Sequence, residues 1–111
     1  MDPMRYKPLG LTVEDVDNEL DQLWVELNKP GSLLAEKALS DGIDVSQIKG
    51  QRRADFITVH SEGAGLDPAT TAIVVAFAPV VAKILRDLWD RILLPRILRA
   101  YGGDSLTPTT K

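Results

Sequence analysis

The sequence contains no cysteine in its 111 residues. This absence excludes disulfide bonds, thiolate nucleophiles and cysteine–zinc sites. Histidine is nearly absent as well, since His60 is the only one. Glu62 follows it on the same side of a predicted strand, and such a pair can transfer protons, but neither a nucleophile nor a second metal ligand accompanies it. We therefore expect a protein that is not an enzyme, with no catalytic residue, metal or cofactor.

Long apolar runs are lacking too. The opening segment MDPMRYKPLG has no apolar stretch of the kind that secretory signals carry. The longest run without a charged residue, 68–82, has 15 residues, which is short of the ~20 that span a bilayer. We expect a cytoplasmic protein, with a peripheral membrane location as the alternative.

Charge is unevenly distributed along the chain. Residues 1–68 carry 7 basic and 13 acidic side chains, whereas residues 69–111 carry 6 and 3. An acidic first half and a basic second half can attract each other, within one molecule or between two copies. The net charge of −3 disfavours duplex DNA as a partner, because neutralisation of phosphates supplies most non-specific affinity.

The composition is that of one globular domain. Apolar residues make up 44% of the chain and charged residues 26%, which is ordinary for a folded protein of this length. We predict a domain over residues 12–103. Residues 1–11 contain two prolines and a glycine and are predicted to be an irregular arm, and the polar residues 104–111 to be a flexible tail.

Periodicity predicts the first elements of an α+β fold that is predominantly helical. An apolar stripe at three- and four-residue steps, with Thr12 as its cap, predicts a helix over 12–28. A second, shorter helix is predicted over 32–41, between Ser32 and a glycine. The β-branched and aromatic segment 55–61 predicts a strand, and 43–48 is either a second strand or a loop.

The third predicted helix runs over 67–100. Asp67 and Pro68 suit its start, and Pro79 and Pro95 predict kinks. Its second half is amphipathic, with charged residues on one side and leucine, isoleucine and tryptophan on the other.

The first half of this helix would be apolar all round and would need burial on every side. A helix over residues 68–94 would be ~40 Å long, too long for so small a domain to surround. We therefore predict a non-enzymatic interaction or oligomerisation module that self-associates or docks a partner protein through this helix. The predicted interface residues are Ala72, Ile73, Val74, Ala76, Phe77, Val81, Leu85 and Trp89. The alternative is a small protein that associates with or perturbs a membrane surface through the same helix.

A second alternative is DNA binding. The segment AEKALSDGIDVSQI places Ala38, Gly42 and Ile48 at the spacing of a helix-turn-helix core and resembles regulators of that class. The resemblance covers about 20 residues and implies a recognition helix after the turn. Asp41 and the following KGQRR depart from the pattern, so a nucleic-acid partner is the less favoured expectation.

Overall fold

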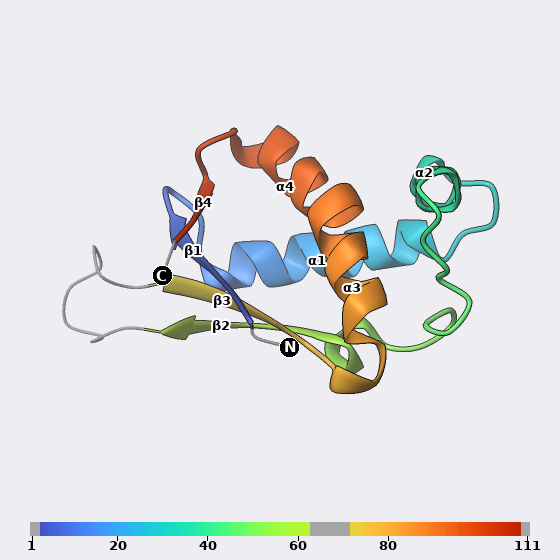
Figure 1. Cartoon of the computed structure of the whole chain (residues 1–111). Coiled ribbons are helices and arrows are strands. Elements are labelled where there is room, and N and C mark those ends of the chain that lie inside the picture. The colour runs from blue at the N-terminus through green and yellow to red at the C-terminus, as the bar shows by residue number, and fades with distance from the viewer. Residues whose placement is uncertain (1–2, 63–71, 110–111) are drawn as a thin grey trace.

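Four strands form one antiparallel sheet, in which β3 and β1 are the central strands (Figure 1). The computed structural model describes residues 3–62 and 72–109. The strands are β1 (Met4–Pro8), β2 (Ile57–Glu62), β3 (Ala72–Phe77) and β4 (Leu106–Pro108), in the order β2-β3-β1-β4. Together with several helices, this sheet confirms the α+β class.

Two helices form where the sequence predicts them: α1 (Val13–Leu27) and α2 (Leu33–Ser40). The Thr12 hydroxyl accepts a hydrogen bond from the backbone N–H of Asp15, whose carboxylate accepts one from the N–H of Thr12. This reciprocal pair is a capping box. The Ser32 hydroxyl caps α2 by accepting from the N–H of Ala35.

The connections give the sheet a known topology. β1 and β2 both run antiparallel to β3, so they are parallel to each other with β3 between them. The order strand, helix, two strands, helix, strand is the split β-α-β, or ferredoxin-like, arrangement. Residues 28–56, which carry α2 and the short helix η1 (Arg53–Asp55), are an insertion between α1 and β2. The topology alone does not specify a function.

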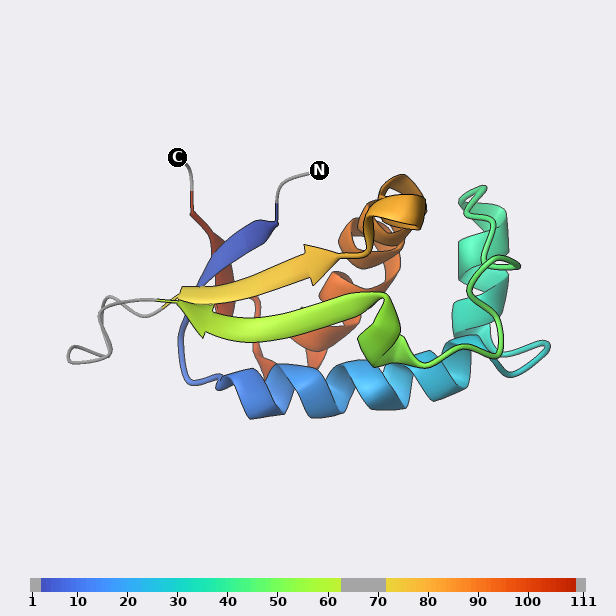
Figure 2. The ribbon, with the colours of Figure 1, turned by 90° about the horizontal axis from the view of Figure 1, so that it is seen from below.

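α1 and the helical residues 82–101 lie on one face of the sheet, and α2 lies beyond the end of the sheet (Figure 2). The strand side chains on that face include Tyr6, Ile57, Ile73 and Val75, all of them buried. They pack with helix residues such as Leu20 into a single apolar core. The core thus fills the space between the two layers.

The opposite face of the sheet carries polar side chains. Arg5 and Glu62 lie on the strands to either side of β3, and Arg5 Nε is 2.7 Å from Glu62 Oε1. The Arg5 guanidinium holds the pKa of the Glu62 carboxyl below its usual range through this hydrogen bond. Val74, between His60 and Arg5 in the ladder, is only 1% exposed on this face. The Arg5–Glu62 ion pair crosses β3 on this same face.

The first half of the predicted third helix is a strand instead. Residues 67–71, with the predicted cap Asp67, lie outside the described residues, and Ala72–Phe77 form β3. Val74 and Val75 point to opposite faces of the sheet and both are buried. A central strand that is buried on both faces is a continuous apolar run. Such a short run cannot be distinguished from a buried helix by its periodicity, and its β-branched residues favour the strand.

From Ala82 to Tyr101 the chain is helical, as predicted. α3 (Ala82–Leu88) leads through a π-helical turn, η4 (Trp89–Leu93), into α4 (Leu94–Tyr101). The N–H of Leu94 donates to the carbonyl of Trp89, five residues back. This wider turn precedes Pro95, which has no N–H and whose ring would collide with the carbonyl four residues earlier in a regular helix. Pro79 opens the 3-10 turn η3 (Pro79–Val81) and kinks no helix.

The predicted irregular arm and the predicted flexible tail each contain a strand. The arm 1–11 contains β1, a central strand of the sheet, and Tyr6 on it is fully buried. The tail 104–111 contains β4, which pairs with β1, and its Ser105 and Leu106 are buried. These strands have almost no sequence signal of their own because each is short and is formed by pairing with distant residues.

Candidate functional site

β2 is one edge of the sheet (Figure 2), and its pairing with β3 determines which backbone groups remain for another strand. The N–H of Ala78 donates to the carbonyl of Phe56 at 2.8 Å. In an antiparallel ladder, hydrogen-bonded and non-hydrogen-bonded pairs alternate, so Ile57, Val59 and Ser61 direct their N–H and C=O groups away from β3. Among the described residues, no hydrogen bond reaches these groups of Val59 and Ser61. We call the outward N–H and C=O groups of Val59 and Ser61 the open edge.

The residues of the open edge lack the sequence features that usually protect an edge strand, although α1 runs alongside β2 (Figure 2). Such edges carry proline, lysine or a bulge, or are very short. Residues 57–61 contain no proline or lysine, and their pairing with β3 proceeds without a bulge. The opposite edge, β4, is three residues long and ends at Pro108. Of the two sheet edges that residues 3–62 and 72–109 form, β2 is thus the one long and regular enough to pair with another strand.

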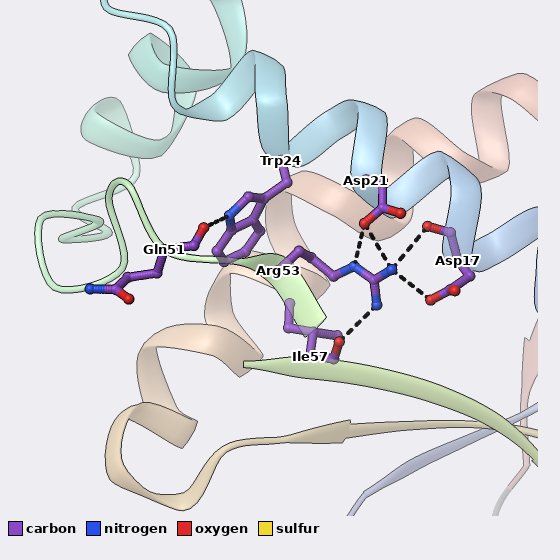
Figure 3. Close-up of polar contacts among 6 residues, drawn as sticks. All are labelled: Asp17, Asp21, Trp24, Gln51, Arg53 and Ile57. Atoms are coloured by element: carbon purple, nitrogen blue, oxygen red, sulfur yellow. Dashed lines mark hydrogen bonds and ion pairs between the residues drawn. The ribbon is translucent and has the colours of Figure 1, made fainter. Parts of the chain in front are cut away.

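Arg53 closes the start of this edge (Figure 3). Its Nη1 donates to the outward carbonyl of Ile57 at 2.9 Å. Its Nη2 lies 2.6 Å from Asp17 Oδ1 and 2.8 Å from Asp21 Oδ1, and its side chain is 5% exposed. The guanidinium therefore takes the position of a neighbouring strand's donor at Ile57 and leaves Val59 and Ser61 open.

A second contact holds the same segment against α1 (Figure 3). Trp24 Nε1 donates to the carbonyl of Gln51 at 2.8 Å. The Trp24 ring stacks on Phe56 with the centroids 6.2 Å apart. Residues 51–57 are thus fixed at two points, which places β2 alongside α1.

A cleft of about 410 Å³ lies beneath the end of β2. Ser61, on the helix-covered face of the sheet, forms one wall, and the first turn of α1 forms another. The lining residues are Pro8, Leu11, Thr12, Val13, Glu14, Ser61 and Ile73. The cleft therefore adjoins the open edge directly and is mainly apolar.

The flank of α1 beside β2 is acidic. Glu14 lines the cleft together with Ser61, and Asp17 and Asp21 reach the start of β2 through Arg53. These positions lie three and four residues apart, which places them on one side of a helix. Three carboxylates therefore face the β2 side, with Arg53 as the cation that contacts two of them.

The other flank of α1 faces basic residues of α4. Arg96 Nη2 lies 3.5 Å from Glu26 Oε1. Arg99 lines the groove between α1 and α4 that Glu26 and Arg96 also line. One ion pair between the acidic and basic halves of the chain thus forms within the molecule. The β2 flank of α1 is left as the more acidic of the two.

A second cleft, of about 480 Å³, lies between α2 and residues 42–49. It is bordered by apolar side chains such as Leu39, Ile43 and Val45. The Asp44 carboxylate accepts hydrogen bonds from the hydroxyl and N–H of Ser46, which lowers the pKa of Asp44. This polar pair is satisfied within the loop, so the cleft offers apolar surface without converging polar groups.

The predicted interface residues do not form an exposed helix surface. Five of them are buried in the chain's own core or sheet: Ile73, Val74, Val81, Leu85 and Trp89. Ala72, Ala76 and Phe77 are half-buried on β3. The surplus of apolar surface inferred from the sequence disappears because residues 72–77 are a central strand that the sheet itself buries.

The helix-turn-helix resemblance lacks its second helix. α2 ends at Ser40, and residues 41–52 form turns instead of a recognition helix or the alternative strand at 43–48. Arg53, the last residue of the KGQRR segment, is a buried ion-pairing residue. No pattern around KGQRR indicates that role, because Asp17 and Asp21 lie more than thirty residues earlier.

The helix predicted to meet a membrane buries its apolar side. Leu85, Leu88, Trp89, Ile92 and Ile97 are each at most 1% exposed. Within residues 3–62 and 72–109, no helix combines the length and apolar character required to cross a bilayer. The same residues contain no cluster of histidine and carboxylate groups suited to a metal ion.

Replacing Arg53 tests whether it fixes β2 to α1. We expect Arg53→Met to lower the free energy of unfolding by about 1.5–3 kcal/mol, because hydrogen bonds from a charged group to buried acceptors are lost. Asp17 and Asp21 are partly exposed and regain water, which limits the loss. Arg53→Lys should be intermediate, since a lysine cannot reproduce the planar fork. Urea unfolding measures the stability of both variants. An unchanged midpoint for Arg53→Met would contradict the role of Arg53 in fixing β2 to α1.

Comparison of the chain with protein-family models, with curated proteins and with solved structures finds no match.

Proposed function

We propose that this protein is a non-enzymatic interaction module that binds an extended segment of a partner protein along the open edge of β2. The observation that carries the proposal is the pair of unprotected backbone positions, Val59 and Ser61, next to a cleft. In binding by strand addition, main-chain hydrogen bonds supply affinity and pockets for alternate side chains supply specificity. The open edge offers the main-chain groups, and the cleft at Ser61 offers a pocket for a side chain.

Other features support an interaction role over catalysis. The single histidine shares the outer sheet face with Glu62, but that carboxylate is held by Arg5. The apolar side of the helical residues 82–101 packs against the protein's own core, which favours a protein partner over a membrane surface. The lack of cysteine agrees with a cytoplasmic site of action.

Self-association through the same edge is the less favoured arrangement. Pairing two β2 edges around a two-fold axis would bring the acidic flanks of two α1 helices toward each other. Like charges brought together cost affinity. Sedimentation equilibrium distinguishes self-association from the binding of a partner segment. Pairing of β2 with β2 would give a dimer, and Ser61→Pro would dissociate it.

The proposal is tested by blocking one outward N–H. Random octapeptides displayed on phage are selected on the folded protein, and an enriched peptide is titrated by fluorescence anisotropy. Ser61→Pro should weaken its binding about tenfold or more, because the substitution removes a donor and adds a ring at the edge. The ladder to β3 does not use this N–H, so the fold should persist.

Ser61→Ala is the matched control, because it removes the hydroxyl and keeps the N–H. We expect its affinity to stay within about twofold of the original, as the side chain contributes little to a backbone contact. Equal affinity for Ser61→Pro and Ser61→Ala, with both folded by circular dichroism, would exclude strand addition at β2.

A further inference from the structure

We propose that the segment bound at β2 has an apolar residue and, two residues later, a lysine or arginine, both facing α1. This inference rests on the proposed function and names the chemistry of the partner. Three features of the described residues carry it: the alternation of side chains along the open edge, the cleft at Ser61 and the acidic flank of α1.

The alternation of side chains along β2 determines which side chains of an added strand point toward α1. Val59 and Ser61 face the helix-covered side of the sheet and also carry the outward backbone groups. A partner residue hydrogen-bonded to either would lie directly opposite it, with its side chain on the same face, about 5.5 Å away between Cα atoms. Side chains on one face recur every second residue, so two of them face α1, one beside each position.

The position beside Ser61 is apolar. The cleft that Ser61 borders continues between Leu11, Val13 and Ile73. A side chain that projects from the added strand at this point enters the cleft. Burying it removes apolar surface of both partners from water. Valine, isoleucine and leucine suit the position.

The position beside Val59 is cationic. α1 runs antiparallel to β2, because Glu14 lies near Ser61 whereas Asp17 and Asp21 are joined to Ile57 through Arg53. Val59 therefore lies alongside the interval between Glu14 and Asp17. The Asp17 side chain is 45% exposed and Glu14 is exposed. Both carboxylates are thus accessible to a second cation.

The direction of the pattern follows from antiparallel pairing, the slightly more stable of the two. A strand that runs opposite to β2 passes Ser61 before Val59. The partner therefore presents the apolar residue first and the cation second. The same charge argument disfavours a second copy's β2, whose residues 57–62 contain no lysine or arginine.

The experiment compares peptide selection by the original protein and by Glu14→Lys. Random octapeptides displayed on phage serve as the probe. The original protein should enrich the apolar–any–Lys/Arg pattern, and Glu14→Lys should lose the preference for Lys and Arg. A selected peptide should bind Glu14→Lys about five- to twentyfold more weakly at low ionic strength, since an attraction is replaced by a repulsion of similar size. Added salt should shrink the difference.

Glu36→Lys is the matched control, because it makes the same charge change at an exposed position of α2. It should select the same peptides as the original protein. Enriched peptides without a cationic preference, or a preference lost equally in Glu14→Lys and Glu36→Lys, would overturn this inference and leave the proposed function standing. If the original protein, verified as folded, enriches no peptide at all, the proposed function itself is overturned.

Discussion

Removal of residues 1–8 should abolish the fold. β1 pairs with β3 on one side and with β4 on the other, so its loss separates β4 from the sheet. It also removes the fully buried Tyr6 from the core. A domain of this size is stable by about 5–15 kcal/mol, and loss of a large buried aromatic alone costs ~3–5 kcal/mol. We expect the truncated chain to show no cooperative thermal transition by circular dichroism.

Two further measurements test whether the loss of β1 is the cause of the unfolding. Amide hydrogen exchange in the intact protein should be slow at Arg5 and Tyr6, whereas an irregular arm would exchange within the dead time. A synthetic peptide of residues 1–10, added to the truncated chain, should restore part of the ordered signal if the lost strand is the cause. A truncated protein that unfolds with the original midpoint would refute the central place of β1.

Trp89→Ala is expected to lower the free energy of unfolding by about 3–5 kcal/mol. Trp89 is fully buried, and its ring meets Tyr6 edge to face with the centroids 5.9 Å apart. Its Nε1 donates to the Tyr6 hydroxyl at 2.6 Å. The pair joins the π-helical turn to the central strand, so truncation leaves a cavity where the helix and sheet layers meet.

Tyr6→Phe separates the hydrogen bond from the packing. It should cost about 1–3 kcal/mol, because the buried indole N–H loses its acceptor while the ring volume is kept. The combination Trp89→Phe with Tyr6→Phe leaves no donor unpaired, and its loss should be smaller than the sum of the two single losses. Urea unfolding at neutral pH measures the set. Additive losses would show that the hydroxyl and the indole act independently.

Local sequence determined the elements whose signals lie within one segment. Thr12 and Ser32 cap α1 and α2 as predicted, because a cap requires only residues three positions apart. The amphipathic residues 82–101 form a helix with one buried side, because a period of 3.6 requires a single neighbouring surface. The strand predicted at 55–61 is β2, since its β-branched residues favour an extended chain.

Tertiary structure decided what depends on distant partners. Ala72–Phe77 is an apolar run that suits a buried helix or a central strand, and pairing with β1 and β2 on both sides selects the strand. β1 pairs with β3 about seventy positions away and with β4 about a hundred positions away, so both β1 and β4 depend on distant partners. The open edge also depends on distant partners, because Val59 and Ser61 are ordinary strand residues in the sequence. β3 pairs with one side of β2, and Arg53 binds the carbonyl of Ile57 on the other side. Residue spacing within the chain carries no record of such contacts, so the candidate site emerged only from the fold.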